Sequence, residues 1–251
     1  MPKISLITAC HNSAATLPET LASVRTQRDA DLEYRVVDGG SKDGTLYILQ
    51  QNDWISHWIS EPDDGIYDAL NKGLELATGD IIGLLHADDV LADDRVLSRV
   101  AKVFADPEVG VCYGDLVYIS RDHPERVVRY WRAGEYRPDL LRRGWMPPHP
   151  TLYVRRRLYQ QHGGFDTRYR IAADYDCMLR LLSRMEGRVV YIPEVLVRMR
   201  TGGVSNRSLG NILRKSAEDY QALRANRIGG FGALAWKNLS KLGQFWRPLI
   251  T

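Results

Sequence analysis

The chain has 251 residues, 44% of them hydrophobic, which suits one large α/β domain or two small ones and excludes a disordered protein. Its 34 basic and 31 acidic residues nearly balance, so the overall charge does not favour nucleic acid as a partner. No stretch approaches the ~20 apolar residues of a membrane-spanning helix, and the N-terminal apolar run is too short for a signal peptide.

The first part of the chain alternates between predicted strands and helices. Residues 4–9 form an apolar run typical of a buried strand. A helix should follow, because Thr16 can cap its start and Glu19 stands three residues later. Residues 34–37 predict a second strand, which ends at Asp38 in a turn rich in Gly and Asp. A second helix should begin near residue 46.

The strongest helical pattern covers residues 66–77, where apolar side chains recur three and four positions apart. A short apolar strand, residues 79–86, comes next and ends in Asp88 and Asp89. Strands that alternate with helices in this way predict a parallel sheet with right-handed crossovers and a ligand site at the carboxyl ends of the strands.

The second part of the chain is less regular. Three prolines within residues 146–150 predict a rigid loop, because proline lacks a backbone donor and fixes φ. No internal repeat or low-complexity linker is present. Regular elements are expected as helices over 96–104 and 174–185 and as strands over 109–113, 151–154 and 189–192, the last closed by Pro193.

The three cysteines, Cys10, Cys112 and Cys177, are far apart and fit no zinc-ligand spacing. We interpret them as core thiols of a protein in a reducing compartment. The expected location is therefore cytoplasmic, with the inner face of the cytoplasmic membrane as a second option.

Several nucleotide-binding classes are excluded by the loop after the first strand, which has neither the G-x-G-x-x-G of dehydrogenases nor a P-loop lysine. Instead, carboxylates gather where strands end, at Asp38, Asp63, Asp64, Asp88 and Asp89. Such a group favours a hard divalent cation that binds one or two carboxylates and substrate phosphate. The alternative is that Asp88 and Asp89 only cap the helix near residue 96.

Four motifs in order resemble family 2 glycosyltransferases with the GT-A fold, a Rossmann-like, mostly parallel α/β sheet flanked by helices. The resemblance covers about residues 3–206 and is strongest to bacterial enzymes of colanic-acid, O-antigen or capsule polysaccharide synthesis. The motifs are ITACHN at 7–12, VVDGGSKDGT at 36–45, EPDDGIYDALNKG at 61–73 and LHADD at 85–89.

The resemblance implies a site for a nucleotide diphosphate sugar, linked to uracil or guanine. Ala87 stands where the family often has the first Asp of its metal motif, which places the Mg²⁺ or Mn²⁺ ligand at Asp89. The residues implied to bind the nucleotide sugar are Thr8, His11, Asp38, Asp63, Lys72 and Asp88.

The same resemblance implies an inverting reaction in which Asp174 is the catalytic base, although an Asp at a helix start is also a common N-cap. Asp176 is expected to be structural. Asp115 and His149 should lie near the acceptor or the donor sugar, and the Gly-rich residues 201–205 could fold over the donor.

We expect residues 1–206 to form the GT-A domain and residues 207–251 a basic helical extension. Trp and Phe side chains in the extension suit a membrane interface, as a lipid-linked saccharide acceptor would require, but also a contact with the domain or with a homodimer partner. Two other functions remain open: a noncatalytic sugar-nucleotide-binding or assembly subunit, and a sugar-phosphate nucleotidyltransferase.

Overall fold

The computed structural model describes residues 1–202 and 209–240. Its strands are β1 (Ile4–Cys10), β2 (Leu32–Asp38), β3 (His57–Ser60), β4 (Ile81–Leu84), β5 (Val90–Leu91), β6 (Val109–Ile119), β7 (Val127–Trp131), β8 (Tyr153–Arg155) and β9 (Arg188–Arg200). Its helices are α1 (Leu17–Arg25), α2 (Thr45–Gln50), α3 (Ile66–Leu76), α4 (Val96–Val103), α5 (Pro138–Leu141), α6 (Arg156–His162), α7 (Ala173–Arg184), α8 (Leu209–Ala225) and α9 (Phe231–Ser240), with the 3₁₀ turn η1 at His149–Thr151.

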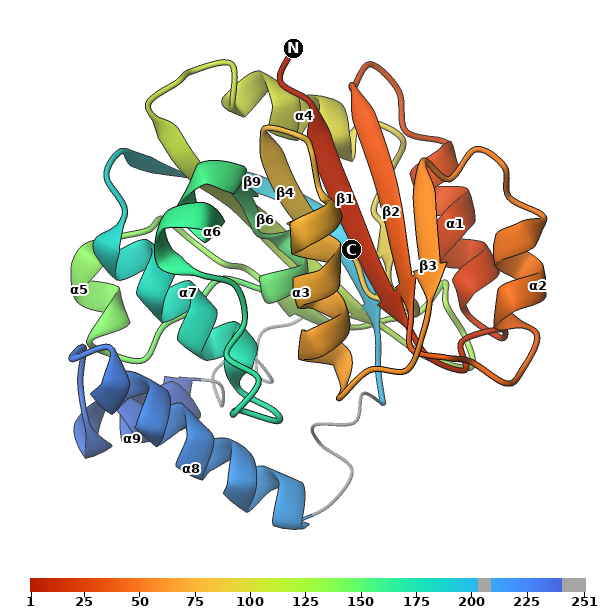
Figure 1. Cartoon of the computed structure of the whole chain (residues 1–251). Coiled ribbons are helices and arrows are strands. Elements are labelled where there is room, and N and C mark those ends of the chain that lie inside the picture. The colour runs from red at the N-terminus through yellow and green to blue at the C-terminus, as the bar shows by residue number, and fades with distance from the viewer. Residues whose placement is uncertain (203–208, 241–251) are drawn as a thin grey trace.

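One sheet runs through the molecule in the order β3-β2-β1-β4-β8-β6-β9-β5, with β7 paired to β6. The first four strands in this order are parallel, so the predicted alternation of strand, helix and parallel strand is confirmed. Strand β8 is antiparallel to both β4 and β6, and β6 is parallel to β9. The carboxyl ends of β1, β2 and β4 therefore meet at one edge of the sheet (Figure 1).

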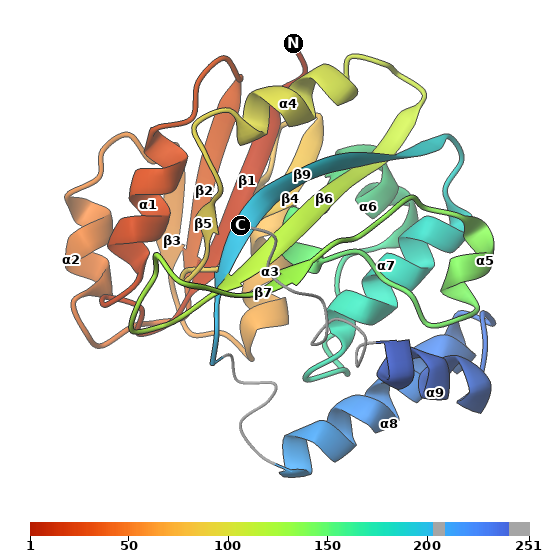
Figure 2. The same ribbon diagram turned by 180° about the vertical axis from the view of Figure 1, so that it is seen from behind.

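The core has two halves, one on each face of the sheet, because successive strand side chains point to opposite faces. Leu6 packs in a cluster with residues of α1 and α4, whereas its neighbour Ile7 packs with residues of α3 and α7. Helices α3, α6 and α7 cover one face (Figure 1), and α4 crosses the other (Figure 2). The three cysteines are free and buried, as expected of core thiols.

Two local predictions were wrong. Strand β9 does not close at Pro193 but continues to Arg200, because a bulge takes up the proline: Gly114 pairs with Ile192, and the next residue, Asp115, pairs with Val195. Thr16 precedes α1 but its side chain makes no capping hydrogen bond, and Glu19 pairs with Arg200 instead.

Helices α8 and α9 pack beside α7 (Figure 1), where Leu223 and Ala233 are buried in the same core cluster as residues of α7. Leu213, Phe231 and Trp236 are exposed. Within the described part of the chain, no helix is both long and apolar enough to cross a bilayer. The predicted boundary between residues 206 and 207, Gly203 to Ser205 of the Gly-rich segment, and the aromatic residues Phe245 and Trp246 lie outside the described residues.

Candidate active site

The loop after β1 meets the loops after β2 and β3 at the carboxyl edge of the sheet. His11 is exposed, and its Nδ1 lies 3.0 Å from the carbonyl oxygen of Gly39. A side chain at Gly39 would collide with Asp63, because an added Cβ would lie 2.2 Å from Asp63 Oδ2. His11 Nδ1 would lie 3.3 Å from the same Cβ, so two of the predicted nucleotide-binding residues approach Gly39 together.

Asp38, the third of this group, is fully buried at the end of β2. Its Oδ1 accepts hydrogen bonds from Ser41 Oγ and Cys10 Sγ, and its Oδ2 accepts from Ser60 Oγ and from the backbone amides of Gly40 and Ser41. Although burial alone would raise its pKa, these donors hold the pKa of Asp38 below its usual value. The carboxylate thus shapes the Gly-rich turn, and both of its oxygens already have protein partners.

Thr8 and Lys72 also have partners within the protein. Thr8 is buried in β1, and its Oγ1 accepts a hydrogen bond of 2.9 Å from the Tyr34 hydroxyl. The Lys72 ammonium lies 2.8 Å from the Glu61 carboxylate and donates to the Pro62 carbonyl oxygen. Lys72 therefore ties the loop that carries Asp63 to helix α3.

A second group of side chains forms where β4, η1 and α7 meet. His86 follows β4, His149 begins η1, and their Nε2 atoms are 3.0 Å apart. On its other side, His149 Nδ1 lies 3.5 Å from Asp174 Oδ2. His86 and His149, 63 positions apart in the chain, thus form a row with Asp174, the predicted base.

The row has one consistent arrangement of protons when Asp174 is ionised. His149 Nδ1 then carries a hydrogen that faces the carboxylate, which leaves Nε2 as an acceptor for His86 Nε2–H. Burial lowers the pKa of His149 to about 4, against the opposing charge of Asp174, and burial also lowers the pKa of His86. Both imidazoles are therefore neutral near pH 7.

Asp174 lies in the first turn of α7 and does not cap it, because the residue at the N-cap position is Ala172. Its Oδ1 accepts from the Tyr175 amide at 2.8 Å and lies 3.4 Å from the Tyr67 hydroxyl. The side chain is 23% exposed, so one carboxylate both contacts the histidine row and reaches solvent. A carboxylate in this position can accept a proton from a bound hydroxyl group.

Asp88 and Asp89 differ sharply in their surroundings. Asp88 is half-buried, and its charge acts on His86. Asp89 is completely buried, and neither of its carboxylate oxygens has a hydrogen-bond partner. Burial, and then the charge of Asp88, raise the pKa of Asp89 well above its ordinary value, against the amide and the charge of Arg200, which lower it. The capping alternative is wrong, because Arg95 occupies the N-cap position of α4.

The two oxygens of Asp89 fit a divalent cation, because they have no hydrogen-bond partner and the nearby Arg200 does not offset the cost of burying the charge. Among the residues that the structure describes, no three His, Cys, Asp or Glu side chains cluster tightly enough to hold a metal by themselves. This donor set suits Mg²⁺ or Mn²⁺, which commonly takes one or two carboxylates and completes its shell with water and substrate phosphate.

Asp115 is buried on β6 and accepts hydrogen bonds from three different segments. Its carboxylate accepts hydrogen bonds from the Tyr130 and Tyr191 hydroxyls, both at 2.7 Å, and from the Ala133 amide. In this arrangement it fixes β7 and the following loop against β9, and any contact with a sugar stays a prediction.

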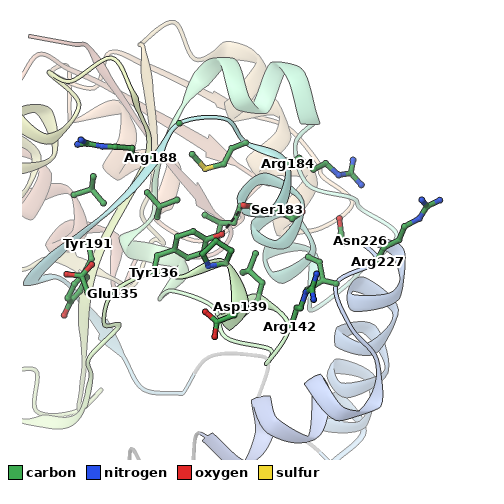
Figure 3. A pocket seen from close by; sticks show the side chains of 18 of the residues that line it. Glu135, Tyr136, Asp139, Arg142, Ser183, Arg184, Arg188, Tyr191, Asn226 and Arg227 are labelled. Carbon is green, nitrogen blue, oxygen red and sulfur yellow. Dashed lines mark hydrogen bonds between the residues drawn. The ribbon is translucent and has the colours of Figure 1, made fainter.

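Three contributors to the site were not assigned roles from the sequence. His86 directly precedes the Asp pair, which could have singled it out. Tyr67 lies within the motif at 61–73, but its contact with the segment before Asp174, like that of Glu218, arises only from folding. A large cavity of about 1380 Å³ lies elsewhere, between α5, the end of α7 and the end of α8 (Figure 3). Arg142, Arg184 and Arg227 line it, and none of the predicted site residues does.

Comparison with known proteins gives consistent matches. The family described as Glycosyl transferase family 2 matches residues 5–178. A PGL/p-HBAD biosynthesis glycosyltransferase of Mycobacterium bovis is 34% identical over 213 residues, which are 82% of this chain and 80% of that protein. The O-antigen biosynthesis protein RfbC of Myxococcus xanthus is 32% identical over 83% of this chain but only 16% of its own length.

A solved structure extends the likeness to the fold. The mannosyltransferase PcManGT of Pyrobaculum calidifontis, in complex with GDP-Man and Mn²⁺, superposes with a TM-score of 0.69 at 22% identity. The match covers 97% of this chain and 72% of that one. The mostly parallel sheet flanked by helices is therefore the GT-A arrangement that the sequence predicts.

Proposed function

The chain belongs to glycosyl transferase family 2, and from that premise we propose that it is an inverting enzyme that transfers a sugar from a nucleotide diphosphate donor to a saccharide acceptor. The observation that carries the proposal is the row His86, His149 and Asp174, which presents one partly exposed carboxylate at the carboxyl edge of the parallel sheet. The PcManGT complex with GDP-Man supports a nucleotide sugar as donor.

In the proposed reaction, Asp174 accepts the proton of an acceptor hydroxyl while the oxygen attacks the anomeric carbon of the donor. The bond from that carbon to the nucleotide diphosphate breaks on the opposite face, so the configuration inverts and the diphosphate leaves with the bonding electrons. One general base is sufficient, whereas a glycosidase would need a second carboxyl group as acid.

His149 orients the base. Its imidazole is neutral and its Nδ1–H faces Asp174 Oδ2. His149 therefore orients the carboxylate without adding a positive charge beside it. The Tyr67 hydroxyl, on the Oδ1 side, limits rotation of the same group. These contacts hold the partly exposed Asp174 carboxylate where an acceptor hydroxyl would bind.

On the donor side, we propose that His11, Asp63 and Asp88 contact the nucleotide sugar, with Thr8, Asp38 and Lys72 behind them as supports. Asp89 would hold a Mn²⁺ or Mg²⁺ ion, which when bound neutralises charge on the leaving diphosphate. The orphaned oxygens of Asp89 support this assignment, as does the Mn²⁺ in the PcManGT complex.

We further propose a lipid-linked acceptor in surface polysaccharide biosynthesis, with the enzyme on the inner face of the cytoplasmic membrane. The O-antigen biosynthesis protein among the relatives supports the polysaccharide, and the exposed Phe231 and Trp236 support a membrane contact. In the alternative, these side chains form a homodimer contact. Measuring the oligomeric state without lipid distinguishes this contact from membrane binding.

The decisive experiment measures binding and turnover of the same donor. Thermal shifts with MnCl₂ and a panel that includes UDP-GlcNAc and GDP-mannose select the donor that stabilises the chain most. Release of the nucleotide, with and without a bacterial lipid extract, then reports turnover. Asp174→Asn should keep the thermal shift and lose roughly 100-fold or more of the turnover. The exposed Asp53→Asn is the matched control, and an Asp174→Asn variant as active as that control would refute the proposal.

A further inference from the structure

Glu218, in the middle of α8, binds the segment that leads into the Asp174 helix. Its carboxylate accepts hydrogen bonds from three consecutive backbone amides: Arg170 N at 3.2 Å, Ile171 N at 2.8 Å and Ala172 N at 2.9 Å. The Glu218 side chain belongs to a residue that is only 8% exposed. A buried carboxylate that converges on three adjacent amides is a specific structural contact and not a solvated surface charge.

The contact supplies what the local sequence lacks. Helix α7 has Ala172 at its N-cap position, and an alanine side chain cannot accept a hydrogen bond from the free amides at a helix start. Glu218, from another helix, accepts from one of the free amides, that of Ala172, and from those of the two residues before it, while the Tyr175 amide in the first turn is bound by Asp174 itself. Its negative charge also lies near the N-terminus of α7, where the helix dipole favours an anion.

The same segment is held from its other side by helix α3. The Tyr67 hydroxyl donates a hydrogen bond of 2.7 Å to the Ile171 carbonyl oxygen. Glu218 thus binds the amide of Ile171 and Tyr67 binds its carbonyl, so this peptide is fixed from two directions. Asp174 follows three residues later, and its carboxylate position depends on where this segment enters the helix.

Helix α8 is itself fixed to the residues that follow Asp174. Asn226 Nδ2 donates to Asp176 Oδ1 at 2.7 Å. Asp219, next to Glu218, pairs at 2.8 Å with the buried Lys237 of α9, whose Nζ lies 3.1 Å from the centre of the Tyr175 ring. The α8–α9 pair therefore contacts residues on both sides of Asp174.

We propose that Glu218 is a positioning residue that holds the segment 170–172, and through it the Asp174 carboxylate, in the orientation needed for catalysis. The inference rests on the proposed role of Asp174 as base. Helix α8 then belongs to the catalytic unit, although the sequence predicted that the GT-A domain ends at residue 206. A displacement of about 1 Å can cost on the order of 100-fold in rate, so this hold has a measurable kinetic effect.

Two substitutions at Glu218 remove its hydrogen bonds to residues 170–172 in part or in full. Glu218→Gln keeps one acceptor oxygen but turns an NH₂ group toward an amide hydrogen, and we expect kcat to fall about 10-fold. Glu218→Ala leaves three amides without a protein acceptor, and we expect a fall of about 100-fold. In both, the KM for the donor should stay within about twofold, because no contact of Glu218 reaches the nucleotide side of the site.

Leu223→Ala is the matched control. Leu223 is fully buried on the same helix, so its truncation also lowers the melting temperature but removes no acceptor from residues 170–172. Backbone amide hydrogen exchange gives a readout that is independent of activity: the three amides should exchange faster in the Glu218 variants and remain protected in Leu223→Ala.

The outcomes separate the inference from the proposed function. If Asp174→Asn is inactive, and Glu218→Ala turns over the selected donor no more slowly than Leu223→Ala, the positioning role is overturned while the base stands. If Asp174→Asn keeps its turnover, both fail together. If Glu218→Ala does not fold, Glu218→Gln decides: unchanged kcat with unchanged exchange of the three amides overturns the inference.

Discussion

His149 and Asp174 face each other at the edge of the sheet, with 3.5 Å between Nδ1 and Oδ2, and His86 closes the row from behind. The spacing is longer than a strong hydrogen bond and short enough to tighten when a substrate orders the site. A neutral histidine in this position orients the carboxylate without adding a positive charge, which would weaken Asp174 as a base.

The first prediction concerns this orienting contact. His149→Asn should lower kcat by roughly 10-fold, because the Asn side chain is too short to hold Asp174 from the same backbone position. The thermal shift caused by the donor should be unchanged, since the contacts of His149 are with His86 and Asp174 and not with His11 or Asp63. Steady-state nucleotide release and thermal shift, measured on one preparation, check the two parts. Loss of the donor shift together with kcat would place His149 in the donor site instead.

The second prediction concerns stability and pH. The pKa of His149 is about 4 in the folded protein and near 6.5 in the unfolded chain, so the unfolded state binds the extra proton first as pH falls. The free energy of unfolding should therefore be undiminished above about pH 6.5 and should decrease between there and about pH 4. In His149→Asn, the decrease in the free energy of unfolding should be smaller by on the order of 1–2 kcal/mol. This figure is reduced because the His149 side chain is partly exposed to solvent.

Urea unfolding of His149→Asn from pH 7 to pH 4 tests this expectation. His123→Asn serves as the control, because His123 is exposed on the loop between β6 and β7. Parallel stability curves for wild type and His149→Asn would show that the buried imidazole does not resist protonation.

The third prediction concerns the cation. Asp89→Asn should raise the stability of the metal-free protein at pH 7 by about 1–3 kcal/mol, because a neutral group of the same shape replaces a buried carboxyl whose ionised form Arg200 does not fully compensate. The sign follows from the raised pKa of Asp89, which means that the folded state disfavours its ionised form.

The same variant should lose the stabilisation that MnCl₂ and donor give to the wild type. Thermal shifts are compared with EDTA, with MnCl₂ and with MnCl₂ plus donor, and the exposed Asp53→Asn is the control. A full Mn²⁺-dependent shift in Asp89→Asn would exclude Asp89 as the ligand.

The fourth prediction concerns Asp38. Asp38→Ala should lower the free energy of unfolding by on the order of 3 kcal/mol, because it removes the acceptor of the amides of Gly40 and Ser41 and of the Ser60 hydroxyl. Since the folded-state pKa of Asp38 is depressed, its contribution is present above the ordinary carboxyl pKa and is lost as pH falls through the lower folded value. Urea denaturation measures the effect, and a loss of donor binding without a loss of stability would instead support direct contact with the nucleotide base.

The fifth prediction concerns the buried pair that fixes α8 to α9. Lys237→Met should cost about 3–5 kcal/mol, because it leaves the Asp219 carboxylate buried without its partner. The double variant Lys237→Met with Asp219→Asn should recover a large part of that loss. A double-mutant cycle by urea denaturation gives the coupling, and additive losses would show that the two charges act independently.

The order of strands and helices could be predicted from the sequence because hydrophobic periodicity is a local property. Strand β1, helix α3 and the chain segment through β4 appear where apolar alternation or helical spacing placed them. Motif order indicated the family for the same reason, since each motif is a continuous stretch. Strand β9 shows the limit: its pattern stops at Pro193, but pairing with β6 carries the strand past the proline.

The sequence by itself determined that carboxylates follow the parallel strands, and that Asp174 begins a helix. Only the tertiary structure decided what those carboxylates face: Asp38 is saturated by donors, Asp89 has none, and Asp174 meets a histidine 25 residues earlier in the chain. The contact of Glu218 with Ile171 spans 47 residues. Such contacts depend on how helices and strands pack, and no local pattern encodes which buried donor will lie opposite a given acceptor.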